Sequence, residues 1–575
     1  MELTQNEQNG QGRGNESAAP SLIRNIVRTT AILLIIIFFV VPIIRLVLMS
    51  FIGDDGFTSE FYREMFSQDR TYEVLKNTLI VVVGSTVIAA FLGVLFAWLL
   101  AYTDVRFKNT IQLFVFLPFI IPSYITSLAW VEFFGPSGTL NSFMSMLGLE
   151  QVAWDLYSMS GLVFVMGISH FPLVYLFTVN VFRRIPREME LAGRSSGAGT
   201  LTAFRKIVLP MALPGIVGGA FIAFLGGLDN FGIPAFLGTP ADIPVLSTYI
   251  YQQIIGFGTS TFNTAAVMSV VLGIIALAGM GIQWLFLRRS KRLETTTMDY
   301  TPRHHLGKKR LMVESVIWLF FIVTGIFPLL SMASTSFLSA YGLDYSLETL
   351  TFKNYSYIFT SSSTVESLTN SVKLASVTTI IGILIGTMIA YYRVRKADTT
   401  IKLIEGTITV PYALPGTVLA LAMIFTWMEP IPGWNPGIYG SALIMYIAYI
   451  TRFLVLQVRS AITAFQQLDT NIEEASRISG TNGWPKWRKI MVPLITPGVL
   501  SGALLVFLSA LTELTVSALL YSSTTKTIGV TILSFQQSGY TLYATAFSSM
   551  IVLLIVAAYC LLFIVQAILN RKVNH

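Results

Sequence analysis

Two acidic side chains fall inside apolar stretches of the sequence, where an ionised group is costly. Asp229 and Asn230 lie in the stretch 213–238, and Thr512 and Glu513 lie in the stretch 497–522. An offset of 283 residues (512 − 229) pairs Asp229 with Thr512 and Asn230 with Glu513, so each stretch brings a carboxylate to nearly the same depth. Two carboxylates near a central axis would attract a cation. A role in helix packing or at a helix end is the alternative.

Catalytic chemistry finds little support elsewhere in the sequence. It contains no GxxxxGK[ST] phosphate-binding loop, no HExxH and no convincing nucleophile–base arrangement. His304 and His305 have no third ligand at a useful spacing, which favours a solvated linker over a metal site. Cys560 is the only cysteine, so an intrachain disulfide is excluded. We therefore assign no catalytic residue, no metal and no cofactor bound by this chain.

The composition predicts that these residues are positioned by membrane helices. Hydrophobic residues make up 54% of the chain and charged residues 12%, whereas soluble proteins average about 25% charged residues. Many apolar runs have the length of roughly 20 residues that spans a bilayer. The net charge is +8, and the basic residues lie at the ends of these runs, which indicates a role in membrane orientation rather than in nucleic-acid binding. We expect an all-α protein with about twelve spans, at 31–51, 77–101, 111–131, 161–182, 213–238, 264–287, 312–336, 371–392, 404–427, 438–458, 497–522 and 547–569.

The distribution of lysine and arginine predicts the orientation of these spans. One set of loops contains nearly all of the basic residues, including the cluster between 288 and 310. The opposite loops contain only Arg63, Arg70, Lys76, Lys353 and Lys526. The positive-inside rule therefore places the first set of loops and both termini in the cytoplasm.

An internal repeat divides the chain into halves. RKIVLPMALPG at 205–215 matches RKIMVPLITPG at 488–498, an offset of 283 (498 − 215). LPFIIPS at 117–123 matches VPYALPG at 410–416, an offset of 293 (410 − 117). With six spans in each half, the repeats are parallel and a path would lie between them. We expect a disordered cytoplasmic tail (1–25), a first unit (26–290), a cytoplasmic linker (291–311) and a second unit (312–575).

The repeated loop after the fourth span of each half has a predicted shape. Charged and apolar residues alternate at helical spacing up to Gly480, which should turn the chain. A second short helix should follow and stop at Pro493. Gly197 and Pro210 repeat this pattern in the first half. A short amphipathic helix held between two spans could transmit force from a soluble partner. The alternative is a polar loop that merely connects two spans. The presence of two copies at equivalent places favours the first interpretation.

These loops resemble the EAA motif of permeases in binding-protein-dependent ABC importers. The matching residues are Glu190, Ala192, Gly197 and Pro210 in the first half and Glu473, Ala475, Gly480 and Pro493 in the second. Leu191, Glu474 and Val492 depart from the motif. The resemblance covers about residues 25–572. It implies a type I importer fold in a bacterial inner membrane, docking of both loops on a homodimeric cytoplasmic ATPase subunit that uses the ATP, and an extracytoplasmic substrate-binding protein as a further partner.

The fused arrangement and the segment LDNFGIPAFLG (228–238) look most like ferric-iron permeases. Permeases for thiamine, polyamines or aminoethylphosphonate remain alternatives. A secondary transporter driven by an ion gradient, or a membrane scaffold, would belong to a different class. The first would not explain two docking loops, and the second would not need a carboxylate at matched depth in each half.

Other polar residues near the spans receive simpler interpretations. Arg45, Glu132 and Arg452 lie near predicted span ends, where snorkelling to the interface is expected. His170 is expected to pack or to form a hydrogen bond within the fourth span. The proline pairs in LPFIIPS and VPYALPG should kink or interrupt the third and ninth spans.

Overall fold

The computed structural model describes residues 29–53, 56–149, 154–256, 259–288, 298–396, 398–428, 438–481 and 483–573. Almost all of its secondary structure is helical, and the tail predicted over 1–25 lies outside the described residues. The first half contains η1 (Ile36–Val40), α2 (Val41–Met49), β1 (Ile52–Gly53), β2 (Gly56–Phe57), α3 (Glu60–Ser67), α4 (Asp69–Tyr102), α5 (Lys108–Ile120), α6 (Ser123–Phe134), α7 (Thr139–Met146), α8 (Met159–Arg184), α9 (Arg187–Ser195), α10 (Thr200–Ala203), η2 (Phe204–Val208), α11 (Leu209–Asp229), η3 (Pro234–Gly238), α12 (Leu246–Ile255) and α13 (Thr259–Leu287).

The second half repeats most of this order, but its described residues have no counterpart of β1, β2 and α7. It contains η4 (Gly307–Lys309), α14 (Arg310–Phe321), η5 (Ile322–Ile326), α15 (Phe327–Thr335), α16 (Lys353–Thr360), α17 (Ser362–Arg395), α18 (Thr399–Ala413), α19 (Gly416–Trp427), α20 (Ala442–Gln466), α21 (Thr470–Ile478), α22 (Trp484–Lys486), η6 (Trp487–Met491), α23 (Val492–Leu511), α24 (Ser517–Leu520), α25 (Ile528–Gln537) and α26 (Thr541–Val573).

The described residues contain ten helices that are long and apolar enough to cross a membrane. Two further helix pairs pass the same test together but bend sharply, by 101° between α5 and α6 and by 109° between α18 and α19. The bends fall at Pro122 and Pro415, each of which precedes the second helix of its pair. Counting each bent pair as one span gives twelve. The predicted count and the predicted interruption by prolines are therefore confirmed.

The predicted fifth and eleventh spans are wrong at both ends. They begin earlier, at Thr200 and Trp484, and end earlier, at Asp229 and Leu511. The prediction that the helix stops at Pro493 is wrong. Neither Pro210 nor Pro493 stops its helix, because a five-residue π-helical segment, η2 or η6, precedes each proline. A π segment widens the helix locally, and we attribute to this widening the room for a proline ring that would otherwise clash one turn back.

The same device recurs in the first span of each half. The segments η1 and η5 end two residues before Pro42 and Pro328, as η2 and η6 end two residues before their prolines. Each proline therefore lies within one span, directly after a π segment, and does not divide it.

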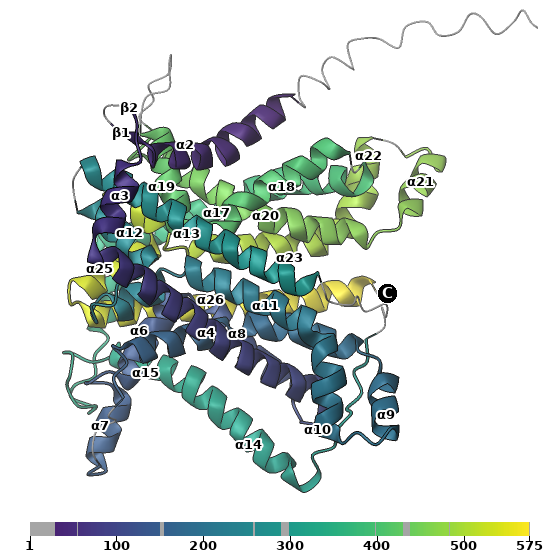
Figure 1. Ribbon diagram of the computed structural model, residues 1–575, viewed down its shortest axis with the longest axis horizontal. Helices are drawn as coiled ribbons and strands as arrows, with labels where there is room; N and C mark the ends of the chain where they lie inside the picture. Colours follow the sequence, from purple (N-terminus) through teal and green to yellow (C-terminus); the bar gives the residue numbers. More distant parts are fainter. Residues whose placement is uncertain are drawn as a thin grey trace, which may run out of the picture.

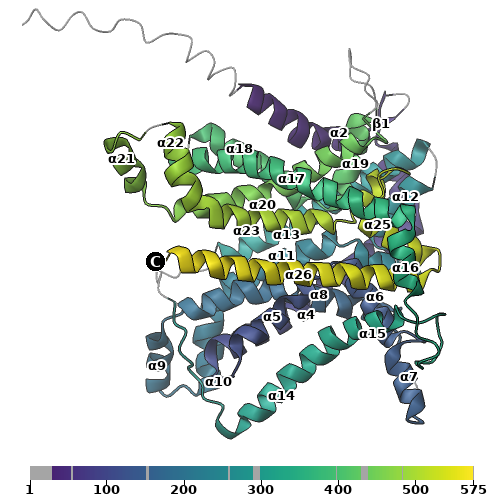
Figure 2. The same ribbon diagram turned by 180° about the vertical axis from the view of Figure 1, so that it is seen from behind.

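The first span of each half packs against the other half (Figures 1 and 2). Phe38 in η1 packs against Trp427 of α19, with ring centroids 5.7 Å apart and the rings tilted by 31°. Conversely, Phe321 at the end of α14 in the second half packs on the first half, with its ring centroid 5.1 Å from that of Phe96 in α4. Figure 1 accordingly shows α2 beside α19, and α14 on the far side of α4. The halves are thus joined by an exchange of their first spans as well as by the linker.

Candidate functional site

The repeated loops form matching structures at one end of the molecule (Figure 1). Each begins with a nine-residue helix, α9 or α21, which ends just before a glycine in the left-handed region. Gly197 has φ of +88° and Gly480 has φ of +75°, conformations that side chains with a Cβ rarely adopt. The predicted short helix and glycine turn are present in both halves. The second short helix is different from the prediction, because it runs without a stop into the next span.

The motif residues divide between a buried and an exposed side of each short helix. Glu190 is 5% exposed and Glu473 is 7% exposed. The two alanines of the motif, Ala192 and Ala475, are exposed in both halves. The exposed side also carries large apolar residues, namely Met189 and Leu191 in α9 and Ile478 in α21. Pro210 and Pro493 are exposed near the start of α11 and α23.

Glu473 is held by two cations. Arg395 Nε donates to Glu473 Oε1 over 2.5 Å, and Lys486 Nζ donates to Glu473 Oε2 over 3.1 Å. Burial by itself would raise the pKa of Glu473, but the hydrogen bonds from Arg395 and Lys486 outweigh it, so the pKa lies below its usual range. The carboxylate therefore stays ionised and ties α21 to the end of α17 and to α22.

Glu190 has partners of a different origin. Arg303 Nη1 lies 3.5 Å from Glu190 Oε2, and His304 Nε2 lies 3.5 Å from Glu190 Oε1. Both partners belong to the segment that connects the halves. The described part of that segment is therefore not uniformly solvated as expected, because Arg303 is 8% exposed and packs on the ring of Tyr102 at 4.5 Å.

Asp229 lies at the contact between the halves, at the end of a helix and not inside a span. It is the last residue of α11. Its Oδ2 accepts a 2.8 Å hydrogen bond from Arg452 Nη2, and its Oδ1 accepts one of 2.6 Å from the backbone N–H of Gly416. Gly416 begins α19 directly after the bend, so the helix N-terminus and a cation converge on this carboxylate. The first half is thereby fastened to the second.

Asn230 and Glu513 perform the same local task in their halves. Asn230 Oδ1 accepts from the backbone N–H of Ile233 over 3.0 Å, and Glu513 Oε1 accepts from that of Val516 over 2.8 Å. Each side chain thus satisfies the first free N–H of the turn that follows its span. Glu513 Oε2 also accepts from the backbone N–H and the hydroxyl of Ser517. The offset of 283 residues therefore matches two caps, and this explains why the spans end where they do.

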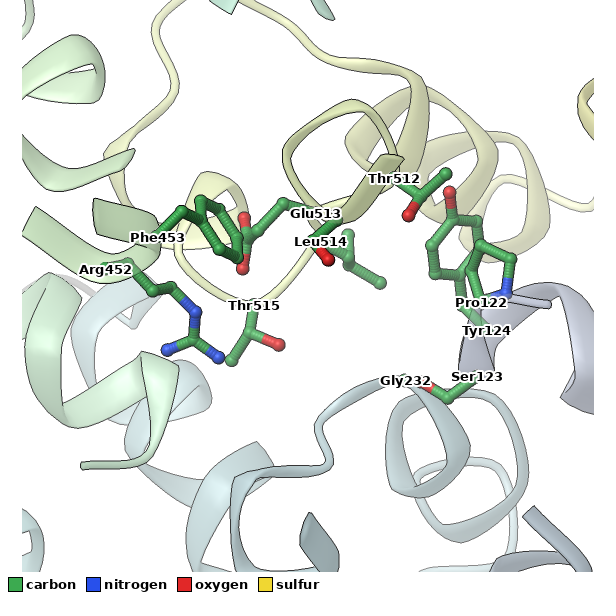
Figure 3. Close-up of a pocket in the computed structure, with 11 residues that line it drawn as sticks. Pro122, Ser123, Tyr124, Gly232, Arg452, Phe453, Thr512, Glu513, Leu514 and Thr515 are labelled. Carbon is green, nitrogen blue, oxygen red and sulfur yellow. The ribbon is translucent and has the colours of Figure 1, made fainter. Parts of the chain in front are cut away.

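A cavity of about 170 Å³ lies beside these residues. Figure 3 shows its lining: the second half contributes Arg452, Thr512, Glu513 and Thr515, and the first half contributes the bend at Pro122, Ser123 and Tyr124. Arg452 Nη1 and the Tyr124 hydroxyl are buried and without a hydrogen-bond partner. Among the described residues, no group of three or more His, Cys, Asp or Glu is arranged to hold a metal ion.

Two interpretations of polar residues near span ends are wrong. Arg452 is buried in the interior of α20, because it has Asp229 as a partner across the halves. Glu132 is 1% exposed in α6, next to the second half's α15, where Ser331 donates to its backbone carbonyl. Both differ from snorkelling side chains because they lie at the contact between the halves, where each meets a residue of the other half. The prediction that His170 forms a hydrogen bond within its span is confirmed, because its Nδ1 lies 2.8 Å from the carbonyl oxygen of Met166.

The comparison with known families agrees with this duplicated architecture. The family of inner membrane components of binding-protein-dependent transport systems matches twice, at residues 89–292 and 382–575. The chain is a fused, two-unit permease of an ABC importer, a multi-pass protein of the inner membrane. It belongs to the family of binding-protein-dependent transport system inner membrane components.

Two ferric permeases are similar to most of the chain, and a polyamine permease is similar to about half of it. The putative ferric transport system permease protein FbpB 1 of Haemophilus influenzae is 26% identical over 86% of this chain and 77% of its own. The ferric transport system permease protein FbpB of Actinobacillus pleuropneumoniae is 26% identical over 92% of this chain and 76% of its own. The spermidine/putrescine permease PotB of Salmonella typhimurium is 23% identical over 48% of this chain and 95% of its own.

Proposed function

We propose that this chain is the permease through which ferric iron, delivered by an extracytoplasmic binding protein, enters the cell. The observation that supports iron most directly is the similarity to ferric transport permeases over 86% and 92% of the chain. The similarity to a spermidine/putrescine permease spans 95% of that relative but 48% of this chain, so it corresponds to one unit of the two and keeps polyamines as the alternative cargo.

The two repeated loops are the proposed docking sites for a homodimeric ATPase on the cytoplasmic side. Each presents exposed apolar residues on a short helix whose opposite side is tied down by a buried glutamate. A rigid helix that is gripped from outside would move with its partner and carry the attached span with it. The basic loops around these helices support a cytoplasmic location for this end and for both termini.

The proposed path runs between the halves past Asp229, Asn230, Thr512 and Glu513. In the described structure Asp229 is engaged by Arg452 and Gly416, and Glu513 is engaged as a cap. We therefore assign to Asp229 and Arg452 the role of closing the contact, and to Thr512 and Glu513 that of lining the adjacent cavity. Cargo would pass only when the ion pair between the halves separates.

Uptake of labelled ferric iron provides the test of cargo. Cells that lack the gene should lose uptake when iron is limiting, and the full chain should restore it. Labelled spermidine, thiamine and aminoethylphosphonate, measured in the same cells, serve as controls for the alternative cargoes. Unchanged iron uptake after deletion would show that iron is the wrong cargo.

Energy coupling is tested separately. The chain purified with its candidate ATPase in lipid vesicles should transport only when ATP and the binding protein are present. Transport by the chain alone, driven by an ion gradient, would contradict the permease mechanism.

A further inference from the structure

The long helices α4 and α17 correspond residue by residue but end differently. Both contain 34 residues, and an offset of 293 (395 − 102) aligns Tyr102 with Arg395. In the second half, Arg395 reaches Glu473 of the repeated loop directly. The first half has a tyrosine at that place, so α4 offers no cation to Glu190.

The segment between the halves brings the missing cation. The backbone N–H groups of Arg303 and His304 both donate to the carbonyl oxygen of Tyr102, over 2.8 and 2.9 Å. The Arg303 guanidinium then lies over the Tyr102 ring, 3.5 Å from Glu190, and Nη2 donates to the carbonyl oxygen of Ile185 over 2.5 Å. Arg303 thus brings to Glu190 the cation that α4 lacks at position 102.

We call residues 299–306 the strap, and both of its ends are fastened to the first half. The backbone N–H of Asp299 donates to the carbonyl oxygen of Arg183 over 2.7 Å. The backbone N–H of Leu306 donates to Asp104 Oδ1 over 2.9 Å, and this hydrogen bond lowers the pKa of Asp104 below its usual range. A segment held at both ends by backbone hydrogen bonds places Arg303 in one position.

We propose that Arg303 is a positioning residue for the first repeated loop, and that the strap performs for Glu190 the task that Arg395 performs for Glu473. The linker then does more than join the halves, because it completes one of the two proposed ATPase-docking helices. This inference rests on the proposed function only for its consequence in transport. The positioning itself is a property of the chain alone.

Hydrogen–deuterium exchange of the purified full chain, without ATPase, tests the positioning. Arg303→Ala should speed exchange in α9 at least tenfold and leave α21 unchanged, and Arg395→Ala should do the reverse. Lys308→Ala, which removes an exposed cation two residues beyond the strap, should change neither. Unchanged exchange of α9 in Arg303→Ala would overturn the proposal.

A relocation variant adds a readout that general destabilisation would not give. Arg303→Ala combined with Tyr102→Arg puts the cation on α4, where the second half has it, and should return α9 exchange toward the wild-type rate. If Arg303→Ala does not fold, Arg303→Lys replaces it, and an exchange rate of α9 equal to wild type in that variant would overturn the need for the guanidinium contacts.

Uptake measured on the same variants separates the two claims. Arg303→Ala should reduce ATP-driven uptake at least tenfold, and the relocation variant should restore part of it. Faster α9 exchange with unchanged uptake would overturn docking at this loop and leave the positioning role of Arg303 supported.

Discussion

At the scale of single residues, an ion pair between Arg452 and Asp229 joins the two halves. Arg452 is 93% buried (7% exposed), in a span where an unpaired cation is costly. Asp229 neutralises it from the other half, and the helix N-terminus at Gly416 adds a second donor to the same carboxylate. A sequence that places an arginine among Ile, Thr and Phe gives no sign of this partner, 223 residues away.

Removal of either member of this pair should destabilise the protein, and the two losses should not add. Asp229→Asn or Arg452→Gln alone leaves a buried charge or donor uncompensated, and we expect a loss of about 3 kcal/mol. The double variant should lose less than the sum of the two, with a coupling energy of about 1–3 kcal/mol. Thermal unfolding in detergent, read as a double-mutant cycle, measures this coupling.

The exposed ion pair between Arg70 and Glu73 provides the matched control. Its cycle should give a coupling of at most about 1 kcal/mol, because solvent screens both groups. Equal coupling energies for the two pairs would argue against a special role for the contact between halves.

The second repeated loop should respond to acid through Glu473. Its folded-state pKa is lowered, so its stabilising effect is complete above the unfolded pKa of about 4.3 and is lost as the pH falls through the folded value. The difference in stability between wild type and Glu473→Gln should therefore be largest near neutral pH and shrink below about pH 4. Glu474→Gln, one position along on the exposed side of α21, serves as the matched control.

At the scale of elements, the loops were predictable and the span ends were not. Gly197 and Gly480 stand at helix stops because their positive φ suits glycine, a local rule that the sequence reveals. Pro210 and Pro493 follow a local rule too, but the wide turn before each proline cancels it. Asn230 and Glu513 looked like intramembrane polar groups because apolar sequence continues beyond them. Their capping role depends on backbone N–H groups that composition cannot show.

Substitutions of Gly197 and Gly480 should weaken the proposed docking through backbone strain and not through a steric clash. A Cβ at Gly197 or Gly480 would meet nothing within 4 Å, so the cost of valine is conformational, about 1–2 kcal/mol at each turn. Gly197→Val and Gly480→Val together should reduce ATPase co-purification and uptake.

Asparagine should be milder at both turns, because it enters the left-handed region more readily. Gly199→Ala, with open space and ordinary φ, serves as the control. Valine variants that co-purify the ATPase as well as wild type would contradict docking at these turns.

At the scale of the whole molecule, the two halves interlock through their first spans. Phe39 packs with Ile389 and Leu454 of the second half, and Ile317 and Phe321 pack among residues of the first. The repeat predicted two similar units side by side, but hydropathy carries no information about which unit an apolar span will contact. The exchange depends on how the surfaces of helices that are hundreds of residues apart in the sequence fit together, and no local sequence pattern encodes this fit.

The interlock predicts that core packing at the exchanged span matters to both halves. Phe321→Ala should lower the stability of the intact protein by about 3 kcal/mol, since it removes a side chain packed against Phe96 and Phe114. Leu319→Ala, at a position that is 60% exposed, should cost far less. Calorimetry that showed a separate, unaffected transition for the first half would contradict the interlock.

The exchanged spans also set an order for synthesis. The helix α2 is made first, but its partner α19 begins 375 residues later (416 − 41). At about 5–20 residues per second, the ribosome needs roughly 20 to 75 s to produce it. During that interval α2 has only lipid, or an insertion chaperone, against the face that α19 will later cover. A nascent chain arrested before Gly416 should therefore leave this helix available to whatever the membrane insertion machinery offers.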